Sequence, residues 1–190
     1  MSQTLTDRVK AIKNTPDTGE QVQIAEFNSA FDKLDNHFVP AAKIYNTVAQ
    51  SYPNAATTMT VFNNTRFDTY AARSEGPMAD LSNEQIIIRK TGLYVVSVSA
   101  NILFNATGYR ALSYKRNATF MRRITQDANV ANSVDTSMSL TDIALLTAGD
   151  LITAHFLQNS GGALSSDPTV GGVQDSQSLS VVWAGSAVEV

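Results

Sequence analysis

The chain has 190 residues, of which 43% are hydrophobic and 16% are charged, and it contains no cysteine. This length suits one well-filled core, and the missing cysteines exclude disulfides, cysteine-ligated zinc and thiol catalysis. The formal net charge of -3 supplies no basic field for a phosphate backbone, so nucleic-acid binding is not expected. The sequence has neither a membrane-spanning apolar run nor the apolar segment of a signal peptide, so we expect folding in a cytoplasm without membrane insertion.

The N-terminal part of the chain is expected to form a helical arm. Leu5, Val9 and Ile12 follow helical spacing over two turns, which is too short to be stable alone. After a turn-rich break at 14–19, five apolar residues step by 3, 4, 3 and 4 positions, and Pro40 ends the pattern. We call these residues the arm stripe: Ile24, Phe27, Phe31, Leu34 and Phe38.

The arm stripe must be covered by something, because water around five large apolar groups is costly. It packs on the protein's own β domain or docks on a partner, and a free-standing coiled coil is the weaker alternative because the stripe covers only two heptads. Residues 41–56 have mixed composition and include Pro53, which indicates a linker. The sequence therefore predicts two parts, a helical arm with its linker at 1–56 and a β domain at 57–190.

The β domain is organised around a long strand expected at 91–104. From Tyr94 to Phe104 every second residue is apolar, and the intervening positions from Ser97 to Asn101 are small and polar. A period of two predicts a strand with one buried face. Gly92 lies at its start, where we expect a backbone conformation that a side chain would disfavour.

Further strands are expected on both sides of this one, with Gly, Asn and Asp between them. Their number and spacing, without any helical period, favour a sandwich or jelly roll. The residues around Gly161 and Gly172 are expected to form a long connection before the last strand. The expected strands are 58–62, 85–89, 109–116, 120–126, 138–146, 151–158 and 179–184.

Three short motifs in order resemble the C1q and tumour-necrosis-factor-like jelly roll. They are Lys-Thr-Gly-Leu-Tyr-Val-Val-Ser at 90–97, Ala-Gly-Asp before an apolar strand at 148–150, and Ser-Leu-Ser-Val-Val-Trp-Ala-Gly at 178–185. The likeness covers about residues 57–185. It implies a mainly β jelly-roll sandwich that assembles as a homotrimer.

Other segments resemble virion proteins of tailed phages of actinobacteria. They lie at 24–28 and 37–43 in the arm and at 66–73 in the β domain. This resemblance implies a structural protein of the virion, a capsid decoration or head fibre anchored by its arm to a major capsid or tail protein. The alternative is a tail-associated receptor-binding head that recognises host cell-wall glycan.

Catalytic chemistry is not expected. The two histidines, His37 and His155, have no accompanying Gly-x-Ser-x-Gly motif, and His155 is interpreted as a structural or interface residue. No Asp-x-Asp-x-Asp loop supplies calcium ligands, and the resemblance to C1q-like proteins, only some of which bind calcium between loops, is the sole pointer to such a site. Asp150 is expected to form a turn through its side chain. We therefore predict a non-enzymatic protein without catalytic residues, cofactor or metal.

Two groups of side chains remain as candidate contacts. Tyr109, Tyr114 and Trp183 would stack on a sugar if they were exposed, although most such rings lie in a core or an interface. A local basic cluster is either a solvated face or a contact to an acidic protein shell. Its members are Arg110, Lys115, Arg116, Arg122 and Arg123.

Overall fold

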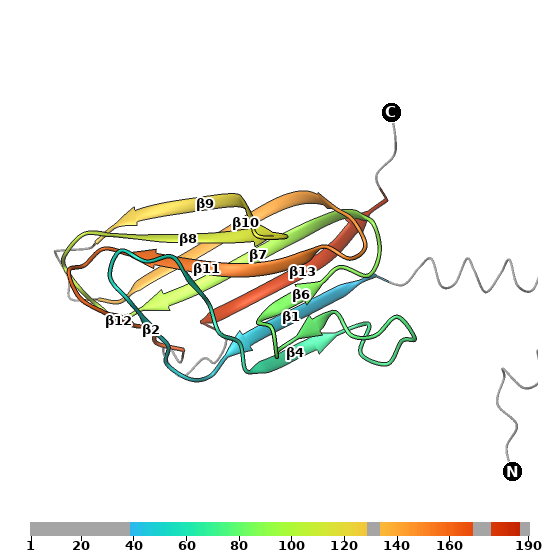
Figure 1. Cartoon of the computed structure of the whole chain (residues 1–190), viewed down its shortest axis with the longest axis horizontal. Helices are drawn as coiled ribbons and strands as arrows, with labels where there is room; N and C mark the ends of the chain where they lie inside the picture. Colours follow the sequence, from blue (N-terminus) through green and yellow to red (C-terminus); the bar gives the residue numbers. More distant parts are fainter. Residues whose placement is uncertain (1–38, 129–133, 169–175, 187–190) are drawn as a thin grey trace, which may run out of the picture. The chain divides into compact units, whose positions relative to one another are not determined.

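The computed structural model describes residues 39–128, 134–168 and 176–186. The chain divides into two compact units, Met1–Val39 and Pro40–Val190, and the second unit contains almost all of the described residues. All regular elements in these ranges are strands (Figure 1). The predicted helical arm and all five residues of the arm stripe lie outside the described residues.

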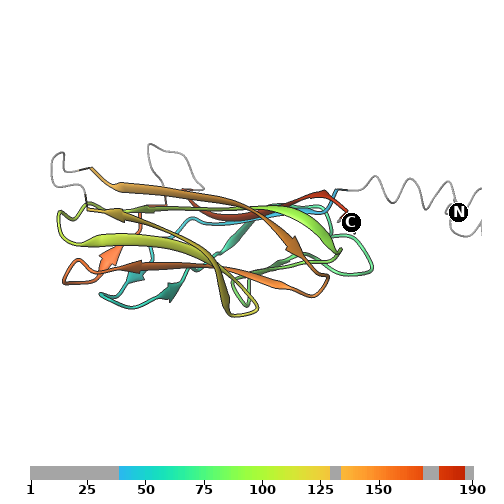
Figure 2. The same ribbon diagram turned by 90° about the horizontal axis from the view of Figure 1, so that it is seen from above.

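The second unit is a sandwich of two antiparallel sheets, which separate into two layers when seen from above (Figure 2). The five-stranded sheet has the order β10-β7-β13-β1-β4. Its strands are β1 (Ala41–Asn46), β4 (Asn64–Asp68), β7 (Gly92–Ile102), β10 (Thr136–Leu146) and β13 (Gln177–Gly185).

The six-stranded sheet has the order β5-β6-β11-β8-β9, and β3 also pairs with β11. Its strands are β3 (Thr58–Met59), β5 (Ala79–Asp80), β6 (Gln85–Ile87), β8 (Tyr109–Arg116), β9 (Thr119–Asp127) and β11 (Leu151–Gln158). Two further short strands form a separate two-stranded sheet. It consists of β2 (Ser51–Tyr52) and β12 (Leu164–Ser165).

The predicted organising strand is confirmed as β7, which lies between β10 and β13. The predicted inward residues from Tyr94 to Ile102 are at most 2% exposed, and Phe104 lies just beyond the end of the strand. Apolar side chains of the other sheet are buried as well, among them Leu112 and Phe156. The core therefore sits between the two sheets, as the period of two in the sequence requires.

Gly92 is needed for a reason other than the one expected. Its φ lies outside the left-handed region, but a Cβ there would collide with Nε1 of Trp183 and lie 2.5 Å from the carbonyl oxygen of Gly185. The start of β7 therefore requires a glycine because β13 passes too close for any side chain.

The predicted linker is wrong at residues 41–46, which form β1. Ala42, Ile44 and Asn46 point inward and are buried, and Ala41 pairs with Val182 of β13 across the five-stranded sheet. Small and polar inward residues weaken the apolar alternation, so this strand is defined mainly by a partner far along the chain. The β unit accordingly begins at Pro40.

The strand expected at 58–62 is only Thr58–Met59 in the structure. Phe62 is nevertheless buried, and its backbone N–H is bonded to the carboxylate of Glu84. The segment is held by side-chain bonds and core packing where the sequence predicted a continued ladder.

Candidate binding surfaces

The outward side of the five-stranded sheet carries an exposed apolar patch. Ile143 lies opposite Val95 and Leu145 opposite Leu93, while Val182 flanks Val95 from the other side. Ile143 is 68% exposed and Leu145 is 51% exposed. Exposed apolar clusters of this kind mark interaction surfaces. We call four of these residues the apolar patch: Leu93, Ile143, Leu145 and Val182.

Hydroxyl groups replace these apolar side chains further along the same face. The hydroxyls of Ser97 and Thr141 lie 3.1 Å apart, and those of Ser99 and Ser178 lie 2.9 Å apart. Each pair bridges neighbouring strands, so the hydroxyls satisfy one another without a ligand. The outward face thus changes from apolar to polar along β7.

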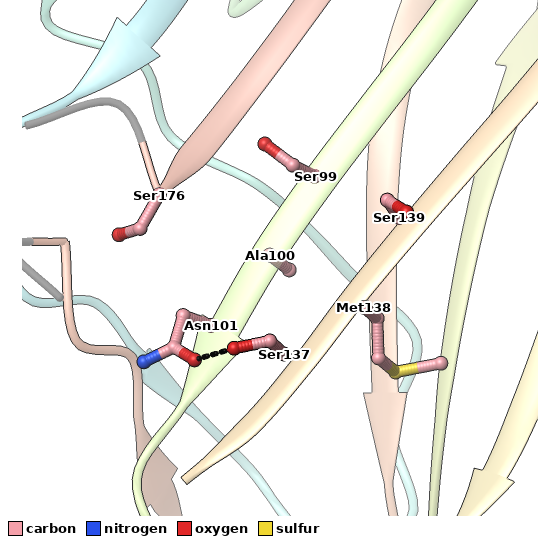
Figure 3. Close-up of a pocket in the computed structure, with 7 residues that line it drawn as sticks. All are labelled: Ser99, Ala100, Asn101, Ser137, Met138, Ser139 and Ser176. Atoms are coloured by element: carbon pink, nitrogen blue, oxygen red, sulfur yellow. Dashed lines mark hydrogen bonds between the residues drawn. The ribbon is translucent and has the colours of Figure 1, made fainter. Parts of the chain in front are cut away.

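A shallow pocket of about 310 Å3 lies at the polar end, between β7, β10 and the start of β13 (Figure 3). Asn101 accepts a hydrogen bond of 2.6 Å from the hydroxyl of Ser137, and Ser176 faces them across the opening. The amide of Asn101 also donates to Asp135 at 3.4 Å. The polar groups of Asn101 already have protein partners, so the pocket has no buried polar group aimed at a ligand.

The predicted basic cluster does not act as a unit, and its assignment as a surface contact is wrong for Arg110. This side chain is fully buried, and its guanidinium donates to the carbonyl oxygens of Asn105, Thr107 and Tyr109 at 3.0 to 3.1 Å. Desolvation lowers the pKa of Arg110. The residue closes the loop between β7 and β8 and is not available to a partner.

Arg116 also has a structural role. Its Nε lies 3.2 Å from a carboxylate oxygen of Asp150, and its guanidinium donates to the carbonyl oxygen of Leu145. Asp150 accepts a further bond of 2.8 Å from the N–H of Thr147, which confirms the turn predicted from its side chain. Arg116 therefore braces the turn between β10 and β11.

Lys115 and Arg123 converge on one aromatic ring. The Nζ of Lys115 lies 4.4 Å and the Cζ of Arg123 lies 5.0 Å from the centre of the Phe120 ring. Phe120 also meets the ring of His155 edge to face, with 6.1 Å between the ring centres. A hydroxyl of Thr153 lies 3.0 Å from Nε2 of His155. We call these five residues the Phe120 cluster.

A bulge in β9 explains why Phe120 and Arg123 share a face. Lys115 pairs with Phe120 and Tyr114 pairs with Arg122, which leaves Met121 as an extra residue. Residues three apart in a regular strand point to opposite sides, and the extra residue reverses that relation. Arg122, opposite the inward-facing Tyr114, belongs to the other side of the strand.

The electrostatics of the cluster follow from its burial. Desolvation, together with the nearby charge of Lys115, lowers the pKa of His155 to about 4, so this imidazole is neutral near pH 7. Lys115 and Arg123 form no ion pair with any residue in the described ranges. The cluster thus places two positive charges and one neutral hydroxyl–imidazole pair around an exposed ring.

The aromatic residues predicted to stack on sugars lie elsewhere. Tyr114 is fully buried and donates a hydrogen bond of 2.7 Å to Asp142. Burial and the carboxylate of Asp142 raise its pKa. Trp183 is half-buried under the Nζ of Lys90, 4.4 Å from the ring centre. Phe120, which no sequence motif singled out, is exposed beside two cations that have no ion-pair partner in the described part of the chain.

Potential metal ligands in the described part of the chain do not cluster. No three His, Asp or Glu side chains there are grouped so that they could hold a metal ion. The same residues include no helix of the length and hydrophobicity needed to cross a membrane.

Comparison with solved structures relates the β unit to a known fold. Eiger TNF from S. frugiperda has a TM-score of 0.58 at 17% identity, covering 80% of this chain and 96% of that chain. Murine APRIL at pH 5.0 has a TM-score of 0.52 at 15% identity, covering 76% and 98%. The globular domain of zebrafish complement 1qA protein has a TM-score of 0.50 at 12% identity, covering 77% and 98%.

No protein-family profile and no curated protein sequence matches the chain. At these low identities the structural likeness establishes the fold and leaves the function open. The strand order and the three related structures confirm the predicted architecture. The described unit of this protein is a TNF/C1q-like jelly roll.

Proposed function

We propose that this protein is a non-enzymatic structural protein of a phage particle, a homotrimer on the virion surface that is anchored by its N-terminal arm. The observation that carries the assembly is the apolar patch on the five-stranded sheet. Leu93 and Val182 are each 38% exposed beside the more open Ile143 and Leu145. A second copy of the chain covers this patch, so the subunits meet through the five-stranded sheets.

Burial of the patch contributes stability to the assembly. Each apolar Å2 removed from water is worth about 25 cal/mol, and association adds to the apparent stability of each subunit. A chain without disulfides benefits from such association outside a cell. The TNF/C1q-like fold, whose resemblance at the sequence level implied a trimer, supports three copies over two.

The position in a virion is supported by sequence alone. The segments at 24–28, 37–43 and 66–73 resemble phage virion proteins, and the arm stripe supplies an apolar surface for docking on a capsid or tail protein. Quantitative mass spectrometry of purified particles tests this role. Hundreds of copies mean capsid decoration and a handful mean a tail position, whereas absence from the particles contradicts the proposal.

The assembly is tested by native mass spectrometry of the full chain at micromolar concentration. We expect a trimer for the wild type and monomers for Ile143→Asp, because a carboxylate in a closed apolar interface is not solvated. Thr125→Asp, on the exposed strand β9, is the matched control and stays trimeric. A wild-type protein that is a clean monomer contradicts the proposal.

The anchoring role has its own test. Deleting residues 1–39 leaves the unit that begins at Pro40, which we expect to fold, to remain trimeric and to lose attachment to particles. The alternative is that the arm stripe packs on its own β unit, and then the deletion causes aggregation or loss of a cooperative melt. Unchanged binding of the truncated protein to particles contradicts anchoring by the arm.

A second candidate function is recognition of host cell-wall glycan by a tail-associated head. The Phe120 cluster favours it, because one face offers an exposed ring, two cations with no ion-pair partner among the described residues, and the hydroxyl of Thr153. This face belongs to the six-stranded sheet, so assembly through the five-stranded sheet leaves it accessible.

A further inference from the structure

We propose that the Phe120 cluster is a binding site for an acidic saccharide, a sugar unit that carries a carboxylate or a sulfate group. This inference rests on the second candidate function and names its site and ligand class. The site lies on the outward side of β8, β9 and β11, where Phe120, Lys115, Arg123, Thr153 and His155 meet.

The two positive charges of the site favour an anionic ligand. Lys115 and Arg123 lie within 5.0 Å of the same ring centre, and within the described ranges neither has a carboxylate partner. The ring offers each cation only a cation–π contact, so an anionic group that reaches both cations would supply the charge compensation that no described residue provides. The guanidinium of Arg123 matches a carboxylate or sulfate with two parallel donors, and Lys115 adds a compact third contact.

The neutral part of the site favours a ligand that carries hydroxyl groups. The hydroxyl of the half-buried Thr153 lies 3.0 Å from Nε2 of the buried His155, so the imidazole leaves that hydroxyl able to accept from or donate to a ligand hydroxyl, depending on the tautomer. Because the pKa of His155 is about 4, the pair adds no third positive charge near pH 7. A mixture of two cations with a neutral polar pair suits a sugar with one acidic group better than a densely charged polyphosphate.

The aromatic part of the site supplies an apolar surface. Phe120 is 46% exposed on a strand at the edge of the sheet, so one side of β9 has no neighbouring strand in the described structure. Lys115 and Arg123 lie over this ring, so the carbon-bound hydrogens of a sugar pack on the part of it that the two cations leave exposed. The open edge of β9 leaves room for further units of a polysaccharide. The β9 bulge is what brings this ring onto the same face as Arg123.

The experiment measures binding of defined oligosaccharides to the full-length protein by calorimetry. The probes are an oligogalacturonate for the carboxylate, a heparin-derived oligosaccharide for the sulfate and a malto-oligosaccharide as the neutral reference. We expect one or both acidic probes to bind and the neutral one to bind at least tenfold more weakly. Affinity for the acidic probe should fall with added salt.

Single substitutions locate the site. Lys115→Gln and Arg123→Gln should each weaken the acidic probe at least tenfold, and Phe120→Ala should weaken it severalfold. Arg122→Gln is the matched control, because it removes the same charge from the next residue on the opposite side of β9. It should change affinity less than twofold, and all variants should keep the wild-type melting temperature within a few degrees.

Four results overturn the proposal. Two are no binding of either acidic probe at millimolar concentration and equal losses in Arg122→Gln and Arg123→Gln. The third is binding of a polyglutamate peptide without binding of the saccharides, which would indicate an acidic protein partner. The fourth is neutral-probe binding that survives Arg123→Gln, which keeps glycan recognition but places it at another site. Native mass spectrometry of the same samples reports trimer formation separately, so the structural proposal stands or falls on its own result.

Discussion

β7 and β9 are both long antiparallel strands, and they differ in what each side of the strand faces. β7 lies between two partners, and its residues alternate between buried and more exposed from Gly92 to Ala100, whereas nearly every residue of β9 is exposed. β9 contains a bulge at Met121, whereas β7 pairs with β10 in regular register along its whole length. A central strand is constrained by packing on the core, and an edge strand is free to present side chains to a ligand.

The largest difference in stability between variants of the two strands is expected when a charge is placed in the core. Val98→Asp on β7 places a carboxylate where the side chain is 2% exposed, which costs several kcal/mol and approaches the whole ~5 to 15 kcal/mol stability of a domain. We expect no soluble folded protein, measured by expression yield and circular dichroism. Thr125→Asp on β9 should change the free energy of unfolding by less than about 0.5 kcal/mol. A folded Val98→Asp variant would show that the buried face is assigned wrongly.

The burial of His155, which lies on β11 and contacts Phe120 of β9, predicts that the stability of the fold depends on pH. The pKa of His155 is lowered from 6.5 to about 4, so between these values the unfolded chain binds a proton that the folded chain does not. The contribution of His155 to the free energy of unfolding is therefore fully present above pH 6.5 and is lost as the pH falls toward 4. The loss is about 1.4 kcal/mol per pH unit and on the order of 3 kcal/mol in all. Urea unfolding at several pH values measures it.

His155→Gln should remove most of this slope between pH 6.5 and 4. Asp80→Asn is the control, because hydrogen bonds from Ser82 and Asn83 lower the pKa of Asp80 to about 2. Its contribution is lost only as the pH falls from near 4 toward 2, below the window of His155. An equal slope in the wild type and His155→Gln would contradict the assigned burial.

A smaller effect is expected where β7 begins. Gly92→Ala adds a Cβ that collides with Trp183, so it should destabilise the fold by about 1–3 kcal/mol. Gly162→Ala, which meets no atom within 4 Å, should be nearly neutral. Chemical denaturation of the two variants measures the difference, and equal stabilities would mean that β13 can move away from β7.

The smallest change in stability is expected for Phe120→Ala on β9. Because the ring is 46% exposed, the free energy of unfolding should fall by less than about 1 kcal/mol. Removal of the ring opens His155 to water, so its pKa should rise from about 4 toward 6.5. Titration of the imidazole by NMR measures this, with Met121→Ala as the control. An unchanged pKa of His155 in Phe120→Ala would show that other residues shield the imidazole from water.

Much of the fold could be predicted from local sequence. β8 and β11 have the predicted bounds, Tyr109–Arg116 and Leu151–Gln158, and the side chain of Asp150 forms the predicted turn. β1 was missed because Asn46 interrupts its apolar alternation and its partner β13 lies more than 130 residues away. Strands defined by distant pairing carry a weak local signal.

The candidate surfaces were predictable only in part. The basic residues are visible in the sequence, but only the fold separates the buried Arg110 and the bracing Arg116 from Lys115 and Arg123. The exposed residues of the apolar patch come from three strands that are distant in the sequence and adjacent in the sheet. The predicted arm stripe lies outside the described residues and stays a prediction.

The sequence by itself determined a β sandwich or jelly roll, its central strand and the buried face of that strand, because a period of two and the turn residues act between near neighbours. Tertiary structure alone decided that β1 joins the five-stranded sheet and that Phe120 faces the same way as Arg123. The first depends on pairing between distant segments, and the second on one extra residue in β9, which inverts the side of the strand on which the following residues lie.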